Sequence, residues 1–326
     1  MRHLFPSAGD MLPCLPYHSS ELTMTRPVPP SCRGVPQLRP RRIVVPLVAA
    51  AMMLAGSYAA PLAAQTADPS VHSAASGVPG GPTYADLAAL ADGNPTILRA
   101  QIRRIAEVPP ERAPGVAANH RRLYVEARTE ALLSGRAPVG ENLKYLVDVP
   151  LNAKGRVPKL KKSQVLLFAR TAPGRADEIQ LVNPTAQLAW TPELEARLRP
   201  IIAAMLAPDA PPRITSIRDA LSVDGNLVGE SESQFFLNTE GDGPVSLSVL
   251  RRPNMAPRWG VSWTEIVDQS AQAPQPDTLE WYRLACSLPA ELPGQANLSR
   301  DPASRARAAQ DYAFVLEQLG ECRRTR

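Results

Sequence analysis

The stretch that decides the fold reads LKYLVDV at residues 143–149. Apolar side chains occupy every second position there and alternate with Lys144 and Asp148, as in a strand with one buried face. The run QVLLFAR at 164–170 is more continuously apolar, and EIQLV at 178–182 follows it after a Pro-Gly turn. The centre of the chain therefore predicts a β-sheet.

A helix and more strands are predicted downstream of this centre. Thr191 and Pro192 are typical of a helix N-terminus, and the apolar spacing continues to Leu206. Four strand-like runs follow, and the last three are expected to form an antiparallel meander: 214–223, 234–238, 245–250 and 258–267. Two helices, 278–286 and 302–320, are predicted at the end.

Upstream of the centre, apolar residues recur at helical spacing. Thr83 is a candidate N-cap for a helix over 84–91, and further helices are predicted over 95–107 and 115–133. We therefore expect one α+β domain, 83–326, with antiparallel sheets. Its three regions are N-terminal helices (83–135), mixed strands and helix (143–267), and a C-terminal disulfide-linked helix pair (277–322).

The cysteines support that disulfide. Of the four, Cys14 and Cys32 lie in the segment that we expect to be removed, which leaves Cys286 and Cys322 as an even pair in an exported domain. The alternative, a catalytic thiolate, would need a base. His120 is the one histidine in a stretch predicted to be structured, and we interpret it as a surface or half-buried helix residue.

Residues 1–64 have the pattern of a signal peptide. The uncharged run Ile43–Ala64 follows a basic RPRR segment and ends in small residues, so cleavage is expected after Ala59 or Ala64. An uncleaved membrane anchor is the alternative. Met24 is a candidate true start, in which case 1–23 is not translated. Residues 65–82 are predicted to be a flexible linker. The domain is expected in the periplasm or secreted, or else anchored in the inner membrane with the domain outside the cytoplasm.

The charge is unevenly distributed. The formal net charge is +5, but the first 64 residues hold six Arg against two acids, which leaves 30 basic and 29 acidic residues. This near-neutral remainder argues against nucleic acid as a partner. Residues 95–175 nevertheless carry 16 basic and 6 acidic side chains, whereas 176–280 carry 7 and 15. The two stretches either pair across the fold or the first forms a basic face for an anionic ligand.

The densest basic segment is the connection between the first two central strands. It reads as a solvated hairpin tip, or as an anion-binding patch for phosphate-bearing envelope glycans or acidic lipid head groups. The candidate residues are Lys154, Arg156, Lys159, Lys161 and Lys162. Three arginines at 251, 252 and 258 would add to it. Trp259 and Trp263 fit a core role better than a sugar-stacking platform.

Enzyme signals are weak. Ser231, in GESES at 229–233, lacks the second glycine of a nucleophile elbow. Glu193 and Glu195 fit the first turn of a helix, where the dipole favours acids. Nothing in the spacing selects a catalytic pair among the other candidate carboxylates: Asp219, Asp224, Glu230, Glu232 and Glu265. No motif for a metal or a cofactor is present.

Our first functional hypothesis is therefore an exported protein that binds an envelope component or a protein partner without catalysis. The first alternative is an envelope hydrolase that uses carboxylates, with Ser231 as a candidate nucleophile. The second is an assembly factor held in the membrane by residues 43–64.

Overall fold

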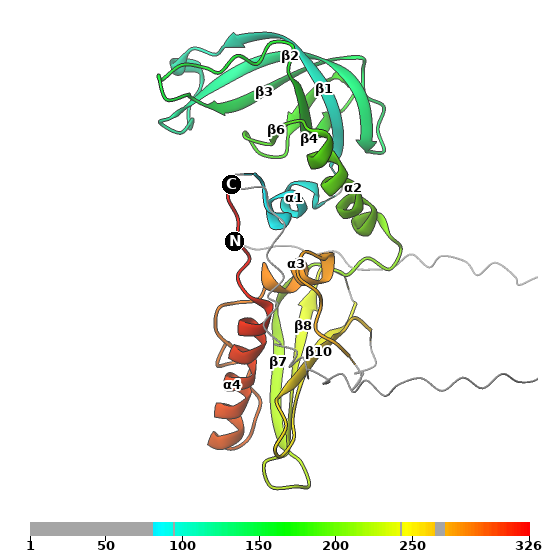
Figure 1. Cartoon of the computed structure of the whole chain (residues 1–326), viewed down its shortest axis with the longest axis vertical. Helices are drawn as coiled ribbons and strands as arrows, with labels where there is room; N and C mark the ends of the chain where they lie inside the picture. The colour runs from blue at the N-terminus through cyan, green and yellow to red at the C-terminus, as the bar shows by residue number, and fades with distance from the viewer. Residues whose placement is uncertain (1–80, 94, 242, 265–270) are drawn as a thin grey trace, which may run out of the picture. The chain divides into compact units, whose positions relative to one another are not determined.

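Five strands form a closed barrel in the first half of the computed structural model, which describes residues 81–326 except 94, 242 and 265–270 (Figure 1). The strands are β1 (Thr96–Glu107), β2 (His120–Ser134), β3 (Asn142–Pro150), β4 (Gln164–Ala172) and β5 (Arg175–Leu181). Their order is β1-β2-β3-β5-β4, and β4 pairs with β1 to close the ring. The short β6 (Gln187–Ala189) pairs antiparallel with β4.

The barrel contains one parallel pair, β3 with β5, and all its other neighbours are antiparallel. A five-stranded barrel with this order is the topology of the OB-fold. Its interior is apolar and includes Leu98, Leu123, Leu143 and Phe168, each at most 1% exposed. Residues 151–163, between β3 and β4, contain no helix.

The predicted N-terminal helices over 95–107 and 115–133 are wrong, because these residues form β1 and β2. Three register irregularities in β1 break the alternation of buried and exposed residues, so that both Ile97 and Leu98 are buried and the pattern resembles a helix. In β2, Leu123 and Ala127 are both buried and lie four residues apart, a spacing that fits a helix as well as a strand. Val125 between them is also buried, and this alternation fits only a strand.

A second sheet is the predicted antiparallel meander with one strand more. It runs β10-β9-β8-β7, with β7 (Ile214–Asp224), β8 (Ser231–Thr239), β9 (Val245–Arg251) and β10 (Arg258–Ser262). The last strand ends five residues before the predicted boundary. Helix α4 (Pro302–Leu319) packs on β7 and β8. There the rings of Phe235 and Tyr312 lie 5.6 Å apart.

Three further helices were predicted nearly to the residue. Helix α1 (Tyr84–Ala91) begins with a capping box formed by Thr83 and Asp86. Helices α2 (Pro192–Leu206) and α3 (Leu279–Ala285) have threonine N-caps. In all three helices, the threonine oxygen satisfies a backbone N–H that the first turn leaves without a partner.

The disulfide between Cys286 and Cys322 is confirmed. Cys286 is the C-cap of α3, and Cys322 lies three residues beyond the end of α4. The bridge therefore joins the ends of the two C-terminal helices. It also holds the segment that follows α4 near α1, where Thr325 donates hydrogen bonds to the carboxylate of Asp86.

None of the helices in the described part combines the length and apolarity of a bilayer span. The predicted signal peptide, its cleavage sites, the candidate start at Met24 and nearly all of the linker lie outside the described residues.

Candidate functional site

The predicted basic patch lies in one exposed loop, residues 151–163, which follows β3 and leads into β4. All five cationic side chains, Lys154, Arg156, Lys159, Lys161 and Lys162, are exposed. Between them Val157 and Leu160 pack against the barrel core. The loop thus holds its apolar residues inward and its positive charges in water.

The backbone of this loop is fixed by hydrogen bonds. Asn152 Oδ1 accepts the backbone N–H groups of Lys154 and Arg156 at 2.9 and 3.1 Å. At the other end, Lys162 N donates to Ile102 O at 2.8 Å, and Ile102 N donates to Ser163 O at 3.0 Å. Because both ends are held, the charges are presented from a defined position rather than from a free chain.

The loop contains no acidic residue, and further cations lie beside it. Arg103 follows Ile102, the residue to which the loop is bonded, and is exposed. The adjacent Arg104 is partly neutralised by Glu126 at 3.7 Å. Positive charges that are concentrated on one surface attract anionic ligands.

A groove of about 610 Å³ lies next to the start of this loop. It separates β3 from β5 and the residues that follow, because the two strands pair only at Lys144 and Glu178. Their next link is the hydrogen bond from Asp148 N to Pro184 O at 2.7 Å. The groove could not be predicted from the sequence, since it is formed by strands that are distant in the sequence.

The groove has an apolar rim and a polar end. Tyr124 and Leu146 face each other across β2 and β3, and both are exposed. Beyond them, Arg122 forms two hydrogen bonds with the carboxylate of Asp148, at 2.7 and 2.8 Å. This hydrogen bonding with Asp148 raises the pKa of the Arg122 guanidinium.

Three other groups in or beside the groove have shifted pKa values. The hydrogen bond and charge of Asp177 raise the pKa of Lys144, and the same 3.0 Å contact lowers the pKa of Asp177. Burial raises the pKa of Tyr145, whose hydroxyl donates to Gln187 Oε1 at 2.7 Å. At neutral pH the groove therefore holds charged ion pairs at its rim and a neutral phenol in its wall.

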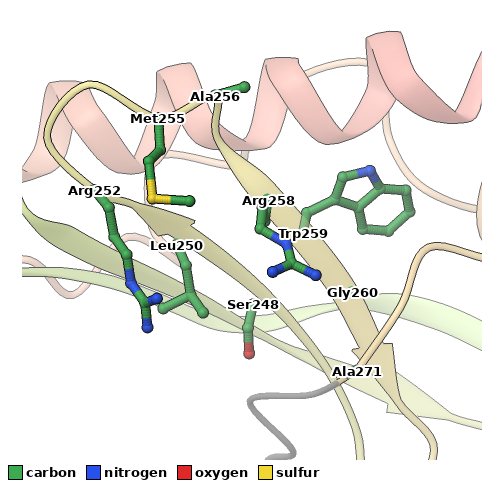
Figure 2. A pocket seen from close by; sticks show the side chains of 9 residues that line it. All are labelled: Ser248, Leu250, Arg252, Met255, Ala256, Arg258, Trp259, Gly260 and Ala271. Carbon is green, nitrogen blue, oxygen red and sulfur yellow. The ribbon is translucent and has the colours of Figure 1, made fainter. Parts of the chain in front are cut away.

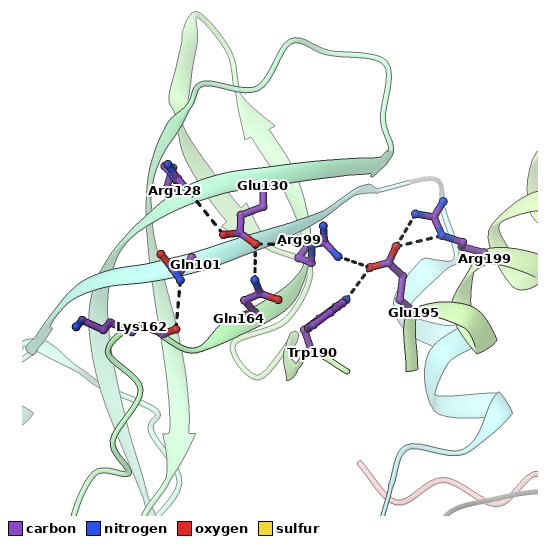
Figure 3. A network of polar contacts seen from close by, with 9 residues as sticks. All are labelled: Arg99, Gln101, Arg128, Glu130, Lys162, Gln164, Trp190, Glu195 and Arg199. Atoms are coloured by element: carbon purple, nitrogen blue, oxygen red, sulfur yellow. Dashed lines mark hydrogen bonds and ion pairs between the residues drawn. The ribbon is translucent and has the colours of Figure 1, made fainter. Parts of the chain in front are cut away.

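Glu195 belongs to a structural network rather than to a catalytic pair (Figure 3). Its carboxylate accepts Trp190 Nε1–H at 2.6 Å and pairs with Arg99 at 3.3 Å and with Arg199. Burial alone would raise the pKa of Glu195, but the bonds from Trp190 and Arg199 lower it. Arg99 also stacks over Trp190, 4.7 Å from the ring centroid. These contacts fasten α2 to the barrel.

The candidate nucleophile Ser231 is buried at the start of β8. Its neighbour Ser233, which the sequence analysis did not single out, lies 2.5 Å from Asp311 of α4. Asp311 in turn pairs with Arg251 at 2.6 Å. Arg251 is therefore neutralised within the second sheet and adds no charge to the basic loop of the barrel.

His120 lies in β2, not in a helix as predicted, and is half-buried as expected. Its Nδ1 is buried and has no hydrogen-bond partner among the described residues. Arg121, the next residue, places a positive charge beside it. Among the described residues, no carboxylate is hydrogen-bonded to this nitrogen, as one would be in a catalytic triad.

Trp259 and Trp263 are half-buried and pack against the core.

The hydrolase alternative would use a carboxyl group with a raised pKa. The described carboxyl groups with a resolved shift, Asp86, Asp177, Glu195 and Asp301, all have lowered pKa values. Across residues 81–326, apart from the gaps, no three His, Cys, Asp or Glu residues gather as metal ligands.

The described residues thus contain a five-stranded barrel with the strand order of an OB-fold, together with a basic loop and a groove. Comparison of the chain with protein-family models finds no match, and no curated protein matches it significantly.

Proposed function

We propose that this chain is an exported protein whose barrel binds an anionic component of the cell envelope, without catalysis. The observation that carries the proposal is the set of five exposed cations on a loop that is hydrogen-bonded internally at its start and to Ile102 of β1 at its end. The uncharged run 43–64 behind a basic segment supports export.

A phosphate-bearing glycan fits this surface best. Its phosphates would contact the lysines and Arg156, and its sugar rings would extend past Asp148 into the groove beside Tyr124. OB-folds of other proteins bind oligosaccharides and oligonucleotides on the face of their second and third strands. This fold-level analogy supports a polymer as ligand but does not select one.

The test replaces Lys159, Lys161 and Lys162 by glutamate and measures binding to lipopolysaccharide and to its dephosphorylated form. We expect the triple variant to lose most of its affinity for the phosphorylated probe, with salt weakening the parent's binding in the same direction. Arg136→Glu/Arg170→Glu/Arg324→Glu is a matched control, since it makes the same change in net charge at exposed sites outside the loop.

Equal binding by the parent and the triple lysine variant would refute the role of the loop. Equal loss in both triple variants would mean that net charge, rather than a site, attracts the glycan. A single-stranded oligonucleotide serves as a second polyanion, and binding as tight as that of the glycan would contradict the choice of ligand.

A further inference from the structure

Two hairpin connections leave the second sheet at the same end. Ser231 pairs with Asp224 on one side and with Arg251 on the other, which places the start of β8 beside the end of β9. The connections 225–230 and 252–257 are therefore neighbours, and we call them together the hairpin tips (Figure 1).

Aliphatic side chains occupy the hairpin tips. Val228 is 100% exposed, Leu227 is 63% exposed and Met255 is 57% exposed. Single exposed aliphatic residues are ordinary on protein surfaces, but here three lie on two neighbouring turns and give this end of the sheet an apolar character. Exposed apolar surface of this kind is a candidate contact for an apolar partner.

Both turns have defined internal hydrogen bonds. The carboxylate of Glu230 accepts the backbone N–H groups of Asn226 and Leu227 at 3.1 and 3.3 Å. In the other tip, Met255 N donates to Arg252 O at 3.2 Å. Both turns therefore have a defined backbone conformation.

The charges around the hairpin tips are also sorted. Arg252 and Arg258 are exposed on either side of Met255 (Figure 2). By contrast, Glu230 is turned into its own loop, and Asp224 is paired with Arg307 at 2.8 Å. Guanidinium groups therefore face outward while both carboxylates are engaged within the protein.

We propose that the hairpin tips form a contact site for an anionic lipid bilayer. Leu227, Val228 and Met255 would enter the boundary between head groups and acyl chains, and the two exposed arginines would bind lipid phosphates. An anionic bilayer offers both an apolar layer for the aliphatic side chains and phosphates for the two exposed arginines, and this combination favours it over a protein partner. This contact would be peripheral and separate from the basic loop of the barrel.

The first experiment uses the protein in the form that the expressing cell delivers to its envelope. It measures flotation of this protein with vesicles of two compositions. One contains phosphatidylglycerol and phosphatidylethanolamine, and the other only phosphatidylcholine. We expect Leu227→Ser/Val228→Ser to weaken binding to the anionic vesicles roughly tenfold or more. Leu206→Ser, at an exposed leucine of α2, is the matched control and should bind like the parent.

The second experiment works even if an N-terminal anchor holds the chain on the vesicle. A polarity-sensitive fluorophore is attached at Val228→Cys or at Leu206→Cys, in a background with Cys14→Ser and Cys32→Ser. A blue shift at position 228 alone, reduced by Arg252→Gln/Arg258→Gln, supports the proposal. It should persist in the triple glutamate variant of the basic loop, which separates this proposal from the previous one.

Unchanged flotation of the Leu227→Ser/Val228→Ser variant, or a label at position 228 that stays in water, would overturn the proposal. Protection of that label by an envelope protein in the absence of lipid would also overturn it, in favour of a protein partner.

Discussion

Arg251 Nε lies 2.6 Å from Oδ1 of Asp311, whose side chain is wholly buried where α4 packs against the second sheet. The hydroxyl of Ser233 donates a hydrogen bond to the other oxygen of the same carboxylate. A buried charge of this kind is tolerated only when its partners remain in place. The pair therefore holds α4 to β8 and β9, the strands that lead into the hairpin tips.

The first prediction concerns this pair. Arg251→Met should destabilise the protein by about 3 kcal/mol, because it leaves a carboxylate buried without its cation. Asp311→Asn should cost less, since Arg251 is partly exposed and can be hydrated. Urea unfolding measures both. An equal or larger loss in the asparagine variant would contradict this account of the pair.

The second prediction concerns the disulfide. The variant Cys286→Ser/Cys322→Ser should lose about 2–4 kcal/mol of unfolding free energy, since the bridge closes a loop across a separation of 36 residues. A reductant should destabilise the parent by a similar amount and leave the double serine variant unchanged. If the reductant affects both proteins equally, the stabilisation does not come from this bridge.

The third prediction concerns acid. Burial would raise the pKa of Asp86, but hydrogen bonds from Thr325 and Thr83 lower it below its ordinary value of 3.8. A folded-state pKa below the unfolded one stabilises the protein above the unfolded pKa, and this stabilisation is lost as the pH falls through the folded value.

Asp86→Asn should therefore cost about 1 kcal/mol at pH 7, as is typical of a lost helix cap, and should flatten the loss of stability below about pH 4. Urea midpoints measured between neutral pH and about pH 2 test this. A slope as steep as that of the parent would show that Asp86 is not the titrating group. Asp209→Asn, at an exposed carboxylate, is the control.

The fourth prediction concerns export. The intact mass of the protein from a periplasmic extract should correspond to a chain that begins at Ala60 or Gln65, with Cys286 and Cys322 blocked until reduced. A full-length mass with free, reactive thiols would contradict export. Recovery of any peptide from residues 1–23 would contradict a start at Met24.

The sequence predicts elements well where one local signal decides them. Thr191 followed by proline sets the start of α2, and two cysteines in a domain predicted to be exported indicate the bridge. The barrel was not predicted, because the bulges in β1 produce helix-like spacing and because closure depends on β4 pairing with β1 across the sequence. A parallel pair such as Lys144 with Glu178 leaves no local signal at all.

The candidate sites likewise differ in how far the sequence alone could predict them. The basic loop is a continuous run of sequence, so its position and exposure could be anticipated. The groove and the hairpin tips could not, since each joins two segments that are separate along the chain. Leu227 and Met255 look ordinary in the sequence and gain meaning only because the register of β8 and β9 places their two turns at the same end of the sheet.

The contact between Thr325 and Asp86 has a consequence for the order of folding. The capping box of α1 receives its outer hydrogen bonds from a residue 239 positions further along the chain. Helix α1 can form its own turns early, but these bonds must wait until the intervening sheets have brought the distant segment back. Closing such a long loop is slow, so we expect the join between α1 and the segment after α4 to be among the last steps of folding.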